Sequence, residues 1–141
     1  MIRIVRGNIF NTRADAIVIP TNVMGAMGKG IALEFRRLYP EGYRFYKKVF
    51  QGDWKVVAWK PPRRKRVFIF LPTKIHWREK SDLELIRRGL RELYTKYSHL
   101  FESIAIPALG TGAGGLKWED VKKVIIEEVS KWRDKNVIIY E

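Results

Sequence analysis

The sequence of 141 residues contains no cysteine and only two histidines. Without cysteine, disulfides, zinc–thiolate sites and cysteine nucleophiles are excluded. His76 and His99 stand far apart in the sequence and do not suggest a metal site, because lone histidines usually serve structure or surface. We therefore expect a cytoplasmic protein with neither a metal nor a cofactor.

Long apolar runs are also missing. No segment approaches the roughly 20 apolar residues that a membrane-spanning helix needs. The first six residues alternate apolar and basic side chains and lack the apolar segment and cleavage site of a secretory signal. Apolar residues still make up 46% of the chain, with five Trp, six Tyr and seven Phe. This composition and length predict one domain over residues 1–141, with no membrane association.

Acidic residues are scarce relative to basic ones. The chain has 15 Asp and Glu against 28 Lys and Arg, a formal net charge of +13. Such an excess favours a polyanionic partner, such as nucleic acid, or an anionic small ligand. The alternative is a charge-rich surface that keeps the protein soluble, for instance at high temperature.

Apolar periodicity predicts strands and helices in alternation. We expect strands at 2–6, 15–20, 55–59, 67–71, 103–107 and 136–140. We expect helices at 31–39, where Pro40 ends the pattern, at 43–51, after a capping box at 81–84, and around Val121–Trp132. Strands separated by helices indicate an α/β domain with helices on both faces of the sheet.

Two glycine-rich loops, 25–30 and 110–115, each follow an apolar strand and precede an amphipathic helix. This context places them at the carboxyl ends of strands, where open α/β sheets bind ligands and helix N-termini favour anions. The first loop lacks the spacing of a P-loop. The second fits G-x-G-x-x-G, but only 26 residues follow it, too few for a nicotinamide-binding half. Two such loops facing one crevice would suit a diphosphate, whereas the alternative is a pair of ordinary strand–helix turns.

Three segments, 15–22, 23–32 and 104–112, resemble a macro domain in the right order along the chain. The segments 7–8, 27–35, 72–74 with 76–78, and 114–118 are similar to DarG-type macro domains in particular. The resemblance implies a three-layer α/β/α sandwich with a mixed sheet of about six strands. It also implies removal of ADP-ribose from thymidine, or another base, in single-stranded DNA.

The resemblance carries roles onto matching positions. Lys74 matches a lysine implicated in catalysis, and Asn22 matches an asparagine near the distal ribose. Asn8 takes the place where many macro domains have an aspartate that contacts adenine; DarG-type domains also have asparagine there. The implied ligand-binding residues are Asn8, Ile9, Gly28, Lys29, Gly30, Ile31, Ala32, Thr73, Gly110, Thr111, Gly112, Ala113, Gly114, Gly115 and Leu116.

An unprotonated lysine could attack the anomeric carbon if burial or nearby cations lower its pKa, whereas a protonated one could assist departure of the leaving group. A related macro-domain glycohydrolase, which removes ADP-ribose from glutamate in proteins, has an aspartate where this sequence has Gly114. The missing aspartate argues against a protein substrate. The alternatives are an ADP-ribose reader without activity, a hydrolase of ADP-ribosyl-glutamate or acyl-ADP-ribose, and a nucleic-acid-binding module without nucleotide binding.

Contacts to flanking DNA are expected from Trp77, Arg78 and Lys80, with the basic turn at 60–66 as a further candidate that we regard rather as a solvated tip. Trp77 would stack on a base or cap the core. Tyr140 would pack on adenine or lie in the core, and we expect the core. The resemblance implies a DarT-like toxin in the same system. Direct binding to it is not expected, since the sequence shows no extension beyond the macro domain.

Overall fold

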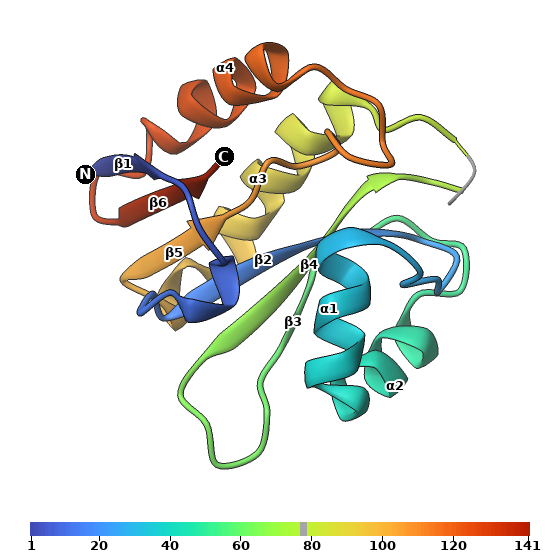
Figure 1. Ribbon diagram of the computed structural model, residues 1–141. Helices are drawn as coiled ribbons and strands as arrows, with labels where there is room; N and C mark the ends of the chain where they lie inside the picture. Colours follow the sequence, from blue (N-terminus) through green and yellow to red (C-terminus); the bar gives the residue numbers. More distant parts are fainter. Residues whose placement is uncertain (77–78) are drawn as a thin grey trace.

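A six-stranded sheet in the order β1-β6-β5-β2-β4-β3 organises the computed structural model, which describes residues 1–76 and 79–141 (Figure 1). All neighbouring strands are parallel except β3, which pairs antiparallel with β4. The sheet is therefore mixed, as predicted. The elements are β1 (Ile2–Val5), η1 (Ile9–Asn11), β2 (Ala16–Asn22), α1 (Gly30–Leu38), α2 (Pro40–Val49), β3 (Val57–Trp59), β4 (Val67–Lys74), α3 (Leu83–Tyr97), η2 (Ser98–Leu100), β5 (Ser103–Ile106), α4 (Trp118–Val129) and β6 (Asn136–Tyr140).

The helices cover both faces of the sheet, which confirms the predicted three-layer sandwich. Successive side chains of a strand point to opposite faces, so Val18 joins a core with α3 and α4, whereas Ile17 and Ile19 join a core with α1 and α2. Because β2 and β4 are buried on both faces, their sequences are nearly continuous apolar runs. The α1/α2 core is aromatic, with Phe35 in contact with the rings of Tyr39, Trp59, Phe68 and Phe70.

Three local predictions were wrong in detail. The second helix was expected at 43–51 but is α2, Pro40–Val49. The first helix does end before Pro40 as predicted, and Pro40 is also the first residue of α2, a position that suits a residue without an N–H. The strand expected at 55–59 contains only Val57–Trp59. The capping residue of α3 is Asp82, whose carboxylate accepts from the Glu84 amide at 2.8 Å. The hydroxyl of Ser81 instead forms a hydrogen bond with that of Thr73, so a tertiary contact overrides the local capping pattern.

Candidate functional site

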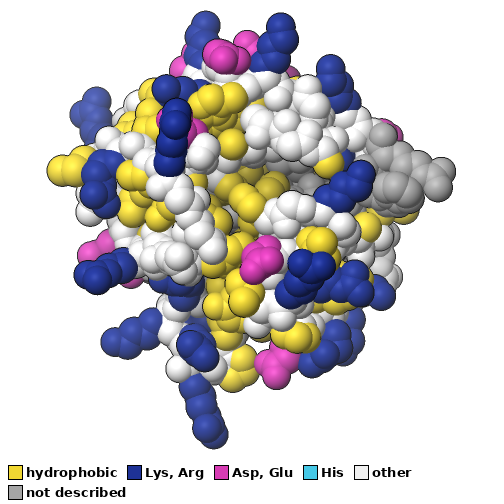
Figure 2. Space-filling model, in the orientation of Figure 1, with side chains coloured by type: hydrophobic (Ala, Val, Ile, Leu, Met, Phe, Trp, Pro, Cys, Tyr) yellow, Lys and Arg dark blue, Asp and Glu magenta, His cyan; other side chains and the backbone are white. Residues whose placement is uncertain are grey.

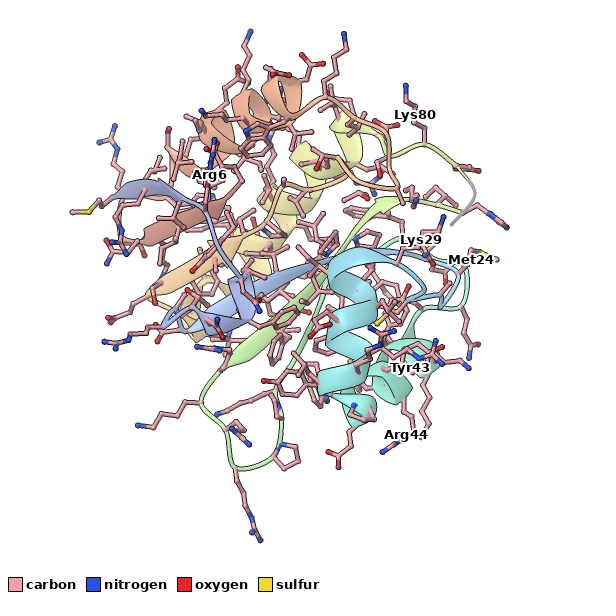
Figure 3. All side chains as sticks on the ribbon, viewed as in Figure 1. Arg6, Met24, Lys29, Tyr43, Arg44 and Lys80 are labelled. Atoms are coloured by element: carbon pink, nitrogen blue, oxygen red, sulfur yellow. The ribbon has the colours of Figure 1, made fainter. Side chains whose placement is uncertain are left out.

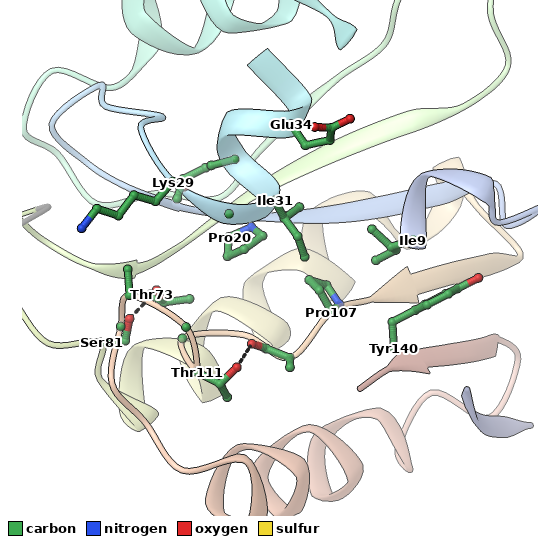
Figure 4. A pocket seen from close by; sticks show the side chains of 18 of the residues that line it. Ile9, Pro20, Lys29, Ile31, Glu34, Thr73, Ser81, Pro107, Thr111 and Tyr140 are labelled. Carbon is green, nitrogen blue, oxygen red and sulfur yellow. Dashed lines mark hydrogen bonds between the residues drawn. The ribbon is translucent and has the colours of Figure 1, made fainter. Parts of the chain in front are cut away.

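A cavity of about 920 Å³ lies at the carboxyl ends of β2, β4, β5 and β6. Figure 2 shows it as a hollow in the face viewed in Figure 1. Both glycine-rich loops line it, as expected for an open α/β sheet. At one end Lys29 lies near Thr73 and Ser81, and at the other Ile9 and Tyr140 lie close together, with Glu34 on α1 (Figure 4). One cavity thus brings together residues from Gly7, after β1, to Glu141, after β6.

The first loop is held in place by Asn22, the last residue of β2. Its side-chain amide donates to Ala26 O at 3.0 Å, and its Oδ1 accepts from the Met24 amide at 2.9 Å. The buried hydroxyl of Tyr46 donates to Asn22 O at 2.6 Å, and burial raises the pKa of that hydroxyl. Only one N–H of the Asn22 amide is left over by these bonds, and Asn22 lines the cavity. Any contact of its amide with a ligand therefore uses this N–H.

Lys74 ends β4 beside Asn22. The two residues are register partners just after a register shift, at which β4 has one extra residue, Thr73, and their strands are neighbours about 4.8 Å apart. Lys74 lines the cavity and is only partly buried. Burial lowers the pKa of its amine below the ordinary value, and the charge of Lys29 lowers it further. Burial and a nearby cation, the two effects expected to lower the pKa of a reactive lysine, therefore both act on Lys74.

The second loop is a tight turn with Gly110 and Gly115 at φ of 72° and 75°, where residues with a side chain are strained. Its own bonds include Leu116 N to Gly110 O at 2.9 Å and Gly115 N to Gly112 O at 3.1 Å. Residues 110–114 line the cavity. Gly115 and Leu116 do not, because their amides close the turn and the Leu116 side chain packs against the α3/α4 core.

Gly114 has no room for a side chain. A Cβ there would lie 2.2 Å from Ser81 Oγ and 2.4 Å from Gly110 O. Ser81 is itself fixed, because its amide donates to Gly114 O at 2.9 Å and its hydroxyl bonds to Thr73 at 2.8 Å. Gly114 is the loop position where a related glycohydrolase has an aspartate, and a carboxylate side chain would find no room there.

Asn8 and Ile9 line the other end of the cavity. The Oδ1 of Asn8 accepts from the Phe10 amide at 2.9 Å and caps η1, which leaves its second lone pair and its side-chain N–H groups for a ligand. Tyr140 was expected in the core. It packs against the α1/α2 core but also lines the cavity, since it lies at the end of β6 where the sheet meets the cavity.

Several residues that line the cavity were not predicted from the sequence: Gly7, Phe10, Pro20, Thr21, Ala26, Glu34, Ser81, Pro107, Ala108 and Glu141. Pro20 and Thr21 could have been found, because Pro20 ends the strand predicted at 15–20 and Thr21 follows it on the way to the first glycine loop. Glu34 lies one helical turn after Gly30, on the helix that the loop introduces, and the spacing alone did not show which way it points. Ser81 was assigned to a helix cap instead.

Of the predicted DNA contacts, Trp77 and Arg78 lie outside the described residues. Lys80 is exposed, and its aliphatic chain packs over Gly115. The 60–66 turn joins β3 to β4 at the end remote from the cavity, since Arg66 and Lys74 are separated by eight strand residues, about 26 Å. Arg66 donates to Thr12 O and Ala14 O. The turn therefore does not border the cavity.

Within residues 1–76 and 79–141, no three His, Asp or Glu side chains come together in a way that would hold a metal ion. No helix formed by these residues has the length and apolar character to cross a membrane.

The chain is similar in sequence and structure to several known proteins. The macro domain family model matches residues 18–125. A curated protein of Thermus aquaticus, named DNA ADP-ribosyl glycohydrolase, is 38% identical over 100% of this chain, which covers 41% of that relative. The solved macrodomain of Mycobacterium tuberculosis DarG is 37% identical, with a TM-score of 0.89 over 99% of this chain and 97% of that one. Thermosipho africanus DarTG in complex with ADP-ribose is 26% identical, with a TM-score of 0.91 over 99% of this chain and 41% of that one. The chain spans about two fifths of the length of the curated relatives it matches.

Proposed function

Because the chain belongs to the macro domain family, we propose that residues 1–141 form a single ADP-ribose-binding domain that releases ADP-ribose from a base in single-stranded DNA. The observation that carries the proposal is the position of Lys74. Lys74 lines the cavity together with both glycine loops, beside Asn22, and the pKa of its amine is lowered by burial and by Lys29. The relatives that are named for this activity or are DarG macrodomains support the substrate.

The ligand would lie along the cavity. Loop 110–114 offers backbone N–H groups and close backbone approach to the diphosphate, in keeping with anion binding by glycine-rich loops. Ile9 and Tyr140 offer apolar and aromatic surface to the adenine at the far end. The free N–H of Asn22 would donate to a hydroxyl of the distal ribose, which brings the anomeric carbon next to Lys74.

The lowered pKa favours the free amine of Lys74 as the reacting group. Its nitrogen attacks the anomeric carbon, the bond from that carbon to the base nitrogen breaks, and the base nitrogen takes up the proton that the lysine nitrogen loses. Water then cleaves the lysine–ribose bond, which releases ADP-ribose and restores the amine. No carboxylate on the second loop takes part, since Gly114 and Ser81 close that position.

The test is release of ADP-ribose from a single-stranded oligonucleotide with one ADP-ribosylated thymidine, by wild type, Lys74→Ala and Lys74→Arg. Arginine keeps a positive charge but supplies no free amine, because its pKa lies above about 12. We expect both variants to bind ADP-ribose and neither to release it. The proposal fails if the wild type releases nothing under conditions where calorimetry shows it binds ADP-ribose. Activity in Lys74→Arg would instead favour a charged lysine that assists the leaving group.

A DNA substrate agrees with the cytoplasmic location expected from the sequence and with a DNA-modifying transferase, such as a DarT-like toxin, in the same system. The proposed link to that enzyme is through its product, modified DNA.

A further inference from the structure

The cations of this protein are distributed unevenly between the two helical layers. Helices α3 and α4 together contain six basic and six acidic residues, whereas α1 and α2 contain five basic and two acidic ones. On the α3 and α4 side, three of the six bases (Arg87, Arg91 and Lys96) form ion pairs. Glu128, with 1% of its side chain exposed, contacts Arg87, Arg91 and also Lys131. Across residues 1–76 and 79–141, none of the cations on α1 and α2 forms an ion pair.

One of these cations, Lys47, lies beside the first loop. Gly25 packs on α2, because a Cβ built there would lie 3.5 Å from Phe50 O and 3.9 Å from Lys47 Cα. The loop is also tied to the end of α2 by the bond from Gly52 N to Val23 O at 2.8 Å. Lys47 therefore borders the loop that lines the cavity.

Two of these cations are held on one aromatic ring. The guanidinium carbon of Arg36 lies 4.4 Å from the centroid of the Tyr43 ring, and the Nζ of Lys47 lies 5.5 Å from it. Both cations are exposed, whereas the ring is half-buried against the α1/α2 core. A fixed ring that attracts two long side chains reduces the conformational entropy they lose when they bind an anion.

Figure 3 shows Lys29, Met24, Tyr43 and Arg44 along the same side of the molecule, from the cavity rim down to α2. In Figure 2, dark blue side chains gather on that side, next to the central hollow. The surface that runs from the rim over Lys47, Tyr43 and Arg36 will be called the Tyr43 surface.

We propose that the Tyr43 surface binds the phosphates of the DNA strand that flanks the modified base, with Arg36 and Lys47 as the two phosphate-binding side chains and Tyr43 as the ring that positions them. The proposal rests on the proposed function for the nature of the polyanion. A strand that leaves the cavity past the first loop runs over Lys47 and Arg36. These contacts read no base sequence, because they are to phosphates alone.

The test measures binding of a fluorescent, unmodified 12-residue single-stranded oligonucleotide by anisotropy, at several salt concentrations. Wild type is compared with Arg36→Ala/Lys47→Ala and with Lys122→Ala/Lys123→Ala on α4, a control that removes the same charge from the opposite layer. Each phosphate contact to single-stranded DNA contributes about 0.7 to the slope of log K against log salt. We expect the Arg36/Lys47 variant to lose about 1.4 from that slope and the control to lose nothing.

Binding of free ADP-ribose and turnover of ADP-ribosylated thymidine as a single nucleoside should be unchanged in the Arg36/Lys47 variant, whereas the KM for the modified oligonucleotide should rise. Tyr43→Leu should weaken oligonucleotide binding, and Tyr43→Phe, which keeps the ring, should restore it. The proposal is overturned if the Arg36/Lys47 variant keeps the wild-type salt slope, or if the α4 control loses as much. Because unmodified DNA is the probe, this result does not depend on turnover, and a protein that releases no ADP-ribose still tests it.

Discussion

Gly114→Ala should destabilise the domain and damage the second loop, although it adds a single methyl group. The new Cβ would lie 2.2 Å from Ser81 Oγ, 2.4 Å from Gly110 O and 2.8 Å from Ser81 Cβ, so at least one of these groups must move by about 1 Å to reach ordinary contact. Gly110 O accepts from Leu116 N, and Ser81 Oγ bonds to Thr73. Moving either group would therefore cost the free energy of a hydrogen bond.

The expected cost follows from two effects. Overpacking of a filled site costs about 1–3 kcal/mol, and loss of the Ser81–Thr73 hydrogen bond adds about 1 kcal/mol. A total of about 2–4 kcal/mol corresponds to a fall in Tm of roughly 5–15 °C for a domain of this size. The five tryptophans allow urea denaturation to be followed by fluorescence, and calorimetry with ADP-ribose reports the state of the loop.

Gly112→Ala is the matched control. Gly112 belongs to the same loop, is not among the glycines with positive φ, and a Cβ there would meet nothing within 4 Å. Its effect on the free energy of unfolding should stay within about 0.5 kcal/mol. Equal stability of the two variants would refute the claim that Ser81 and Gly110 close this position. The same clash would oppose an aspartate at Gly114 even more strongly.

Three further perturbations test other parts of the structure. Lys29→Ala removes a positive charge that lowers the pKa of Lys74, so that pKa should rise and the ascending limb of the pH–rate profile should move to higher pH; an unshifted limb would separate Lys29 from the reaction. Thr21→Val removes a buried hydroxyl that has no hydrogen-bond partner in the described chain, so the free energy of unfolding should increase by about 1 kcal/mol in urea denaturation; a decrease would show that the hydroxyl is satisfied, for example by water. For Glu128, burial raises the pKa, but the bonds and charges of Arg91 and its neighbours outweigh it and hold the pKa below the ordinary value. Its contribution to stability is therefore present above the pKa of the unfolded chain and lost as pH falls through the folded one, so Glu128→Gln should cost about 2 kcal/mol at pH 7 and progressively less below about pH 5. A difference that does not change with pH would contradict this account of Glu128.

The sequence predicted the sheet well where burial leaves an unambiguous pattern. The apolar run in β2 and the helical spacing of Leu83, Ile86 and Leu90 in α3 reflect which faces are covered, and the structure confirms both. Local patterns failed where a distant residue decides the outcome. Ser81 belongs to a plausible capping box, but its hydroxyl is bound by Thr73, and Asp82 takes the cap.

The site was predicted in outline from the two loops, and its details depend on tertiary contacts. No spacing in the sequence shows that the Asn22 amide is largely occupied by its own loop, or that Lys29 lies close enough to lower the pKa of Lys74. Likewise, the missing carboxylate at Gly114 is visible in the sequence, but its steric cause is the position of Ser81.

The central claim is tested most directly by single-turnover release of ADP-ribose from three substrates under identical conditions: an ADP-ribosylated single-stranded oligonucleotide, an ADP-ribosylated glutamyl peptide and an acylated ADP-ribose. With Lys74 in the cavity and no room for an acid at Gly114, the account predicts release from the oligonucleotide and from neither of the others. Release from the glutamyl peptide at an equal or higher rate, or from none of the three by a protein that binds ADP-ribose, would contradict it.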